Sequence, residues 1–251
     1  MMKPRLVLLA VCLLLVPASA PAALERSLDH VWTARAGLGD EAWAEVLRIE
    51  NQRRTGRYPR ILHALVFEFE GLLWFYTPTE GTQSLSLYVD RLDQERADLR
   101  PLLQAIERGF TRWEVLPQGP APARATPLEQ LPNGCFVACV SEWRRLRRER
   151  VAVAAALLLS FYEDAGAGSG GHTVLAYEVA GELQVYDPAD GKTARRFSPR
   201  LLADPLALAR AVGGDRVQRF RTLTLVTSGA PVLLAQAKQP ERGKSAEVLG
   251  G

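Results

Sequence analysis

Residues 172–187 carry the sequence HTVLAYEVAGELQVYD, which decides the fold of the second half of the chain. Segments 173–179 and 182–187 are rich in β-branched and aromatic residues, the composition typical of strands. The Ala-Gly pair at 180–181 has the length of a tight hairpin turn. The stretch therefore predicts a pair of adjacent antiparallel strands.

The register of this hairpin brings two polar side chains together. A turn at 180–181 pairs Val174 with Asp187 by counting back from the turn. His172 lies on the same face as Val174 because side chains alternate along a strand. His172 and Asp187 are then diagonal neighbours at about 7 Å between their backbones, whereas a one-residue change in loop length would put them on opposite faces. We expect the helix that carries Cys135 to pack on this shared face, with its sulfur near the imidazole.

Cys135 lies where a helix is expected to begin. Asn133 and Gly134 are helix-starting residues, and apolar residues then recur at helical spacing as far as Leu146. In a first turn, unpaired N–H groups and the positive end of the helix dipole favour thiolate over thiol. Cys139 lies one turn deeper on the same side, where we expect buried packing. A disulfide between the two cysteines is the alternative, although so small a loop contributes little stability.

Cys135, His172 and Asp187 together supply a nucleophile, a base and a group that orients the base. Taken singly, a histidine at a strand edge and an aspartate that starts a turn are ordinary structural features. In combination with an upstream cysteine they favour catalysis. His30 and His63 have no acidic or cysteine neighbours at metal-site spacing, and we expect both to be packed or surface residues and the chain to hold no metal.

A helix-borne Cys, a His that opens a strand after Gly, and an Asp on the next strand together resemble the papain-like superfamily, particularly its transglutaminase-like and bacterial cysteine-peptidase members. Segments 171–177 and 185–188 carry the resemblance, which covers roughly residues 130–190. The family often has an oxyanion-hole glutamine about six residues before the cysteine. Gln130, five residues before Cys135, is the candidate for that role here.

The resemblance implies a reaction. Cys135 would attack an amide or ester carbonyl, His172 would take and return the proton, and Asp187 would fix the imidazole. It implies a peptide or amide substrate and needs no cofactor, and it leaves peptidase, amidase and acyl transferase open. The alternative is an exported binding or assembly module that keeps the fold without activity, in which the Cys135 thiol would be buried and slow to react.

Residues 1–22 have the features of a cleaved export signal. Two basic residues precede an apolar run at 6–16 that is too short to span a bilayer, and small residues follow at 18–23. We expect cleavage after Ala22 and a secreted or periplasmic protein. The alternative is an uncleaved membrane anchor.

Composition supports a globular protein with a sizeable core, because 47% of the 251 residues are hydrophobic and 24% are charged. Loss of the signal leaves nearly equal numbers of basic and acidic residues, so the overall charge does not favour a nucleic-acid partner. The arginine-rich segment 143–150 has apolar residues at helical spacing, which is typical of an amphipathic helix with a solvated face. We expect no nucleic-acid binding and no membrane contact beyond the signal.

The chain is expected to have an α+β fold in two parts: an N-terminal region at 23–116 and a papain-like region at 128–228, where a Cys-bearing helix packs on an antiparallel sheet. A proline-rich connector at 117–127 separates them, and residues 229–251 form a polar tail. Because it precedes this connector, the N-terminal region would be a removable inhibitory cover if the catalytic trio were sealed.

Local patterns predict the elements within each part. Four helices are expected: one over 24–50, one after Asp98, one from Cys135 and one over 199–212. In the first, Asp40 is expected to cap the half that follows it. Strands are expected over 61–70, 72–76, 84–89, 111–116, 155–162, 173–179, 182–187 and 218–227. For the apolar run at 155–162 the alternative is a continuation of the helix from Cys135.

Overall fold

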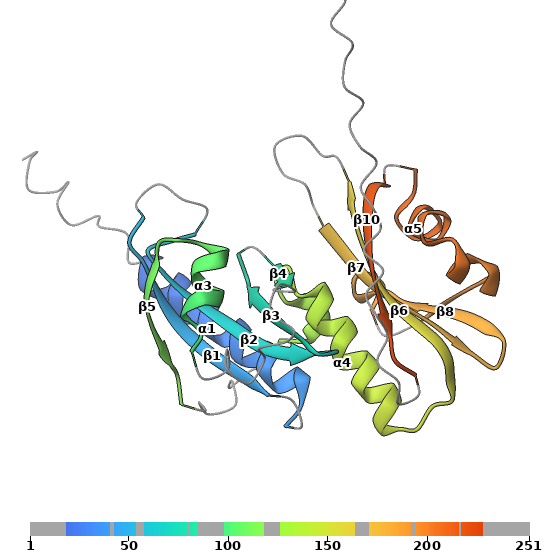
Figure 1. Ribbon diagram of the computed structural model, residues 1–251, viewed down its shortest axis with the longest axis horizontal. Helices are drawn as coiled ribbons and strands as arrows, with labels where there is room; N and C mark the ends of the chain where they lie inside the picture. Colours follow the sequence, from blue (N-terminus) through green and yellow to red (C-terminus); the bar gives the residue numbers. More distant parts are fainter. Residues whose placement is uncertain are drawn as a thin grey trace, which may run out of the picture.

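Two antiparallel sheets with helices between them make up the α+β fold of this chain, as the computed structural model shows (Figure 1). The structure describes residues 19–40, 43–53, 58–79, 81–84, 98–117, 126–163, 171–191, 194–215 and 217–227. Most of the expected signal, most of the proline-rich connector and the C-terminal tail lie outside the described residues. Within the described residues, no helix is long and apolar enough to cross a membrane.

The first sheet, sheet A, is formed by the N-terminal region. Its strands occur in the order β4-β3-β2-β1-β5, with β1 Ala44–Asn51, β2 Ile61–Phe69, β3 Leu72–Thr77, β4 Gly81–Ser84 and β5 Phe110–Val115. Helix α3, Arg100–Ile106, packs on one face through Leu102 and Leu103, which are fully buried.

The second sheet, sheet B, is formed by the C-terminal region in the order β10-β6-β7-β8-β9. Its strands are β6 Val153–Glu163, β7 Gly171–Val179, β8 Glu182–Tyr186, β9 Arg195–Phe197 and β10 Val217–Leu225. Helix α5, Pro205–Gly213, covers one face through Leu208 and Ala209. Short 3₁₀ turns connect the elements: η2 Leu128–Gln130, η3 Pro188–Asp190 and η4 Pro199–Ala203.

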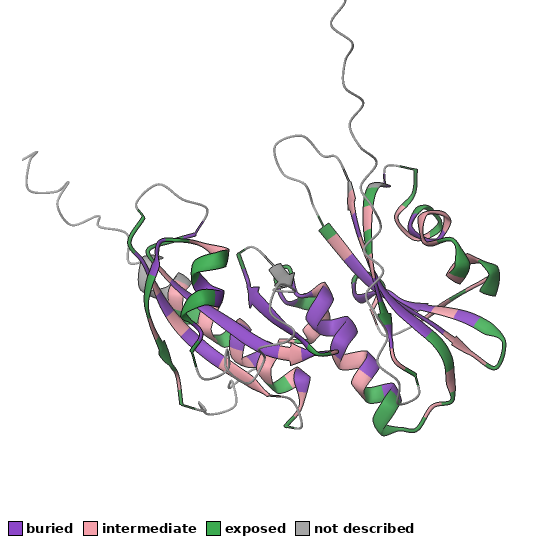
Figure 2. Cartoon of the chain, viewed as in Figure 1, coloured by how far each residue is buried: buried purple, intermediate pink, exposed green. Residues whose placement is uncertain are grey.

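Helix α4, Cys135–Arg148, lies between the two sheets, and helix α1, Ser19–Leu38, packs along sheet A and against α4 (Figure 1). One hydrophobic cluster runs from sheet A through both helices to sheet B, and Trp143 of α4 is its largest fully buried side chain. Each such large side chain contributes about 1.5–3 kcal/mol through burial. Figure 2 shows the buried residues of α4 against the sheets and its exposed residues at the C-terminal end. The two regions therefore share a core.

Arg144 of α4 adds a polar link within this core. Its guanidinium donates to the Leu38 carbonyl at the end of α1 at 2.7 Å and to the Glu68 carbonyl of β2 at 3.0 Å. The carbonyls at the end of a helix have no intrahelical partner, and a cation there is favourable. The expectation that the arginines of segment 143–150 form a solvated face is therefore wrong for Arg144.

The expected helix over 24–50 is confirmed as far as Leu38, where α1 ends, but its second half is wrong. Residues 44–51 form strand β1, which pairs with β2 on one side and with β5 on the other. Val46 faces the helices between the sheets, whereas Leu47 and Ile49 face the α3 side. Alanine, glutamate and leucine suit helices by local propensity, but pairing on both edges outweighs that small preference.

Most other elements agree with the sequence patterns. The expected strands of sheet B and the helix beginning at Cys135 are present, and the expected strand at 111–116 is β5. The expected helix over 199–212 is divided into η4 and α5, because Asp204 is not helical and its side chain caps α5 ahead of Pro205. The expected strand at 84–89 lies largely outside the described residues, and β4 ends at Ser84.

Candidate active site

The hairpin that carries the candidate base has the predicted register. Val179 pairs with Glu182 across the turn, and Leu175 pairs with Tyr186. Ala180 and Gly181 have φ values of 53° and 77°, as the favoured two-residue hairpin turn requires. His172 and Asp187 are therefore diagonal neighbours, as the sequence predicts.

Asp187 is held at both carboxylate oxygens. His172 Nε2 donates to Oδ1 at 2.7 Å, and the Ala189 backbone N–H donates to the same oxygen at 2.9 Å. Arg195 Nη2 donates to Oδ2 at 3.1 Å, and Arg195 Nε also pairs with Asp190 at 3.1 Å. The Asp187 side chain is only 8% exposed. Because Nε2 is bound to Asp187, Nδ1 is the nitrogen left to face a nucleophile.

The two cysteines of α4 bond to the backbone of β7 where β8 has ended. Pairing with β8 stops at Leu175, so Thr173 has no described strand on that side. A hydrogen bond from the Thr173 backbone reaches the Cys135 sulfur, and Cys139 Sγ donates to the Thr173 carbonyl at 3.4 Å. Cys135 and Cys139, one helical turn apart, therefore satisfy polar backbone groups that a strand would otherwise satisfy.

Cys135 lies at the first residue of α4, as predicted, and is half-buried. Burial alone would raise the pKa of its thiol. Hydrogen bonding to His172 and its charge, with hydrogen bonds from Thr173, outweigh burial and lower the pKa of Cys135 below its ordinary value. The Thr173 hydroxyl lies 2.9 Å from the Ser160 hydroxyl, and this hydrogen bond holds the Thr173 side chain in position.

The charges of the trio are mutually supporting. Burial opposes a charge on His172, but hydrogen bonds to Asp187 and Cys135 raise its pKa to about 10. Burial would raise the pKa of Asp187, but the hydrogen bond and charge of His172 lower it. A lowered pKa of Cys135 and a raised pKa of His172 both favour a thiolate–imidazolium pair beside the Asp187 carboxylate, which is the charge arrangement of an activated cysteine nucleophile.

Cys139 differs sharply from Cys135. It is fully buried, and burial together with the charge of Cys135 raises the pKa of its thiol. Both cysteines are free thiols in the structure, which contains no disulfide between them. Cys139 is a packing residue, as the sequence predicts.

Helix α4 does not cover the face that carries His172 and Asp187, contrary to expectation. It packs on the face of sheet B that bears Leu175 and Tyr177. The His172 ring is on the opposite face, which α5 covers, and packs edge-on against Phe161 with ring centroids 5.4 Å apart. Cys135 and His172 interact at the beginning of β7, where the sheet is open beside Thr173. No described strand pairs with this end of β7 on the β8 side, which allows a contact that alternation would otherwise prevent.

Gln130 is not brought to the trio by any described contact. It ends the η2 turn, its side chain is exposed, and its backbone N–H bonds to Pro127. The first turn of α4 has Gly134 as its N-cap and no capping side chain. Backbone N–H groups beside Cys135 are therefore the better candidates for binding an oxyanion.

Sequence reasoning missed residues that support the trio. Thr173 follows His172, so its side chain points to the opposite face of the strand. The hairpin register alone could have predicted this orientation. Arg195 and Tyr76 come from β9 and β3, so only the tertiary fold places them near the site.

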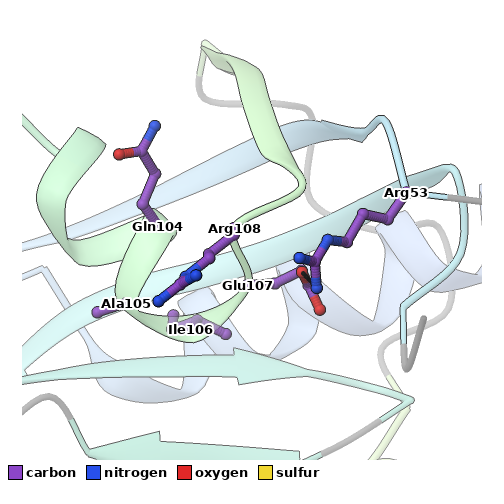
Figure 3. Close-up of a pocket in the computed structure, with 6 residues that line it drawn as sticks. All are labelled: Arg53, Gln104, Ala105, Ile106, Glu107 and Arg108. Carbon is purple, nitrogen blue, oxygen red and sulfur yellow. Dashed lines mark ion pairs between the residues drawn. The ribbon is translucent and has the colours of Figure 1, made fainter. Parts of the chain in front are cut away.

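The remaining candidate sites are elsewhere. His63 is buried in β2 with a lowered pKa caused mainly by burial, and His30 is a half-buried residue of α1. Within the described ranges, no group of three or more His, Cys, Asp or Glu side chains is arranged to hold a metal ion. A hollow of about 520 Å³ lies beside the end of α3, where Arg53 and Glu107 reach toward one another at 3.3 Å (Figure 3). It is on the face of sheet A away from α4 and is unrelated to the trio.

No family model matches this chain, and comparisons with curated proteins and with solved structures find no match. The geometry of Cys135, His172 and Asp187 is therefore the basis for a functional proposal.

Proposed function

We propose that this chain is an exported cysteine hydrolase or acyl transferase of the papain-like kind that acts on an amide or ester through Cys135, His172 and Asp187. The observation that carries the proposal is the interaction of His172 with both neighbours. Its Nε2 bonds to Asp187, and its charge lowers the pKa of the Cys135 thiol. An isolated buried cysteine would instead have a raised pKa, as Cys139 does.

The proposed reaction follows from these protonation states. The Cys135 thiolate attacks the carbonyl carbon, and N–H groups at the start of α4 stabilise the resulting oxyanion. His172 gives its proton to the leaving amine or alkoxide as the C–N or C–O bond breaks, which leaves a thioester on Cys135. Water or a second amine then attacks the thioester while His172 takes its proton, and the thiolate leaves. Asp187 keeps the imidazole oriented throughout.

Export remains part of the proposal and rests on the basic, apolar and small-residue pattern of residues 1–22. Cleavage after Ala22 is compatible with the fold. The described core residues of α1 are Val31, Ala34 and Leu38, all of which the mature chain would keep.

The proposed covalent intermediate can be trapped with p-nitrophenyl acetate, an activated ester. We expect a burst of nitrophenolate and an acetyl group on the peptide that contains Cys135, because the thiolate is the strongest nucleophile of the site. Cys135→Ala should lose both signals. Cys139→Ser, which keeps a donor for the Thr173 carbonyl, should retain them. Acetylation of neither cysteine in the folded protein would favour the inactive binding module.

A further inference from the structure

The turn that delivers Cys135 to the site is held by the other half of the chain. Residues 131–134 precede the helix, and Gly134 donates its N–H to the Leu131 carbonyl at 3.0 Å. A Cβ at Gly134 would approach Leu131 Cβ to 2.5 Å, so the turn is too tight for a side chain there. We call residues 131–134 the pre-cysteine turn.

Three hydrogen bonds join this turn to sheet A. Tyr76 of β3 donates its hydroxyl to the Pro132 carbonyl at 2.9 Å. Asn133 Nδ2 donates to the carbonyls of Pro78 and Thr79, just beyond β3, at 2.8 Å and 3.2 Å. Each bond links residues more than fifty positions apart. The two bonded residues of the turn are the ones that lead directly into Gly134 and Cys135.

The conformation of Asn133 depends on these bonds. Its φ is 53°, in the left-handed region that most residues avoid and asparagine tolerates. Tyr76 is fully buried, so its hydroxyl has no water to replace a lost partner. Phe136, in the first turn of α4, stacks on Trp74 of the same strand at 4.2 Å between ring centroids. Sheet A thus holds the chain on both sides of Cys135.

We infer that Tyr76 and Asn133 are positioning residues for the nucleophile, and that the N-terminal region is part of the catalytic unit rather than a removable cover. This inference rests on the proposed function. Sheet B supplies His172, Asp187 and the Thr173 hydrogen bonds, whereas sheet A fixes where the sulfur lies relative to them. Displacement of the pre-cysteine turn would weaken the thiolate–imidazolium contact and raise the pKa of Cys135 toward that of a free thiol.

Isosteric changes at these two residues test the inference. Tyr76→Phe deletes the hydroxyl, and Asn133→Asp replaces a donor by an acceptor in nearly the same shape. Asn133 is exposed, so its variant should fold. Matched controls are Tyr58→Phe and Asn51→Asp, on the α3 side of sheet A. Asn51 resembles Asn133 because its Nδ2 donates to a backbone carbonyl, that of Tyr58, at 3.0 Å.

The readout is the rate of Cys135 alkylation by iodoacetamide against pH in the folded protein. We expect both site variants to react about tenfold more slowly than wild type near pH 6.5, with the rise in rate displaced to higher pH. The controls should lose stability but keep the wild-type profile. Unchanged profiles in Tyr76→Phe and Asn133→Asp, with a low-pH plateau in wild type, would overturn this inference alone. Absence of the plateau in wild type would overturn the proposed function as well.

A chain cut within its connector provides a second measurement. A protease site introduced into residues 118–125 of the full chain allows the folded protein to be nicked. We expect the two pieces to remain together through size-exclusion chromatography, because they share a core, and the alkylation profile to be preserved. Separation of the pieces with equal or faster alkylation of the C-terminal piece would show that the N-terminal region is a cover and would refute the inference.

Discussion

Replacing His172 with alanine is expected to lower the alkylation rate of Cys135 about 100-fold near pH 6.5. A free thiol has a pKa of about 8.5, so only about one molecule in a hundred is thiolate at that pH, whereas the proposed ion pair with His172 is expected to keep the wild-type sulfur ionised. Burial of Cys135 acts in the same direction once the imidazolium is gone, because it raises the pKa of the thiol. The measurement is the rate of iodoacetamide labelling, with the labelled peptide assigned by mass spectrometry.

His30→Ala is the control for this change, since His30 is a half-buried histidine of α1. It should leave the labelling profile of Cys135 unaltered. Equal rates in wild type and His172→Ala across the acid range would contradict the proposed ion pair.

Asp187→Asn is expected to reduce acyl transfer by about 10³–10⁴-fold, a loss of the size seen when a triad carboxylate becomes an amide. The amide has one acceptor oxygen, whereas Asp187 uses Oδ1 for His172 and Ala189 and Oδ2 for Arg195. In either orientation, the NH₂ group of the asparagine would face a group that itself donates, namely Arg195 or His172 and Ala189. Loss of the negative charge also removes the main support for the raised pKa of His172.

The same variant should be less stable than wild type by about 3 kcal/mol, because it leaves a buried charged network without its centre. Steady-state release of nitrophenolate and thermal unfolding measure the two effects. Asp190→Asn is the matched control, since Asp190 is exposed and its described partner is Arg195. An Asp187→Asn variant as active as Asp190→Asn would show that the carboxylate does not orient His172.

Local chemistry predicted the parts of the site that depend on short spacing. The pairing of His172 with Asp187 follows from the length of one hairpin turn, and the location of Cys135 follows from the residues that begin a helix. Both predictions are confirmed. They succeed because turn length and helix capping act over a few residues.

Features set by distant residues escaped prediction. Strand β1 has a helix-compatible composition, and only its pairing with β2 and β5 makes it a strand. The opening beside Thr173 depends on where β8 ends relative to β7. The hydroxyl of Tyr76 meets the pre-cysteine turn across a long stretch of chain, and no local pattern contains that contact.

The central claim is that Cys135 is an activated nucleophile, and the pH dependence of its alkylation in the wild-type protein tests this most directly. The lowered pKa of Cys135 and the pKa of about 10 for His172 define a pH range in which the thiolate and imidazolium coexist. The rate should rise at a pH well below 8.5 and then remain level through neutrality, because the thiolate is already formed there. A single rise at or above about pH 8.5, or no labelling of Cys135 until the protein unfolds, would contradict the claim and favour the binding module.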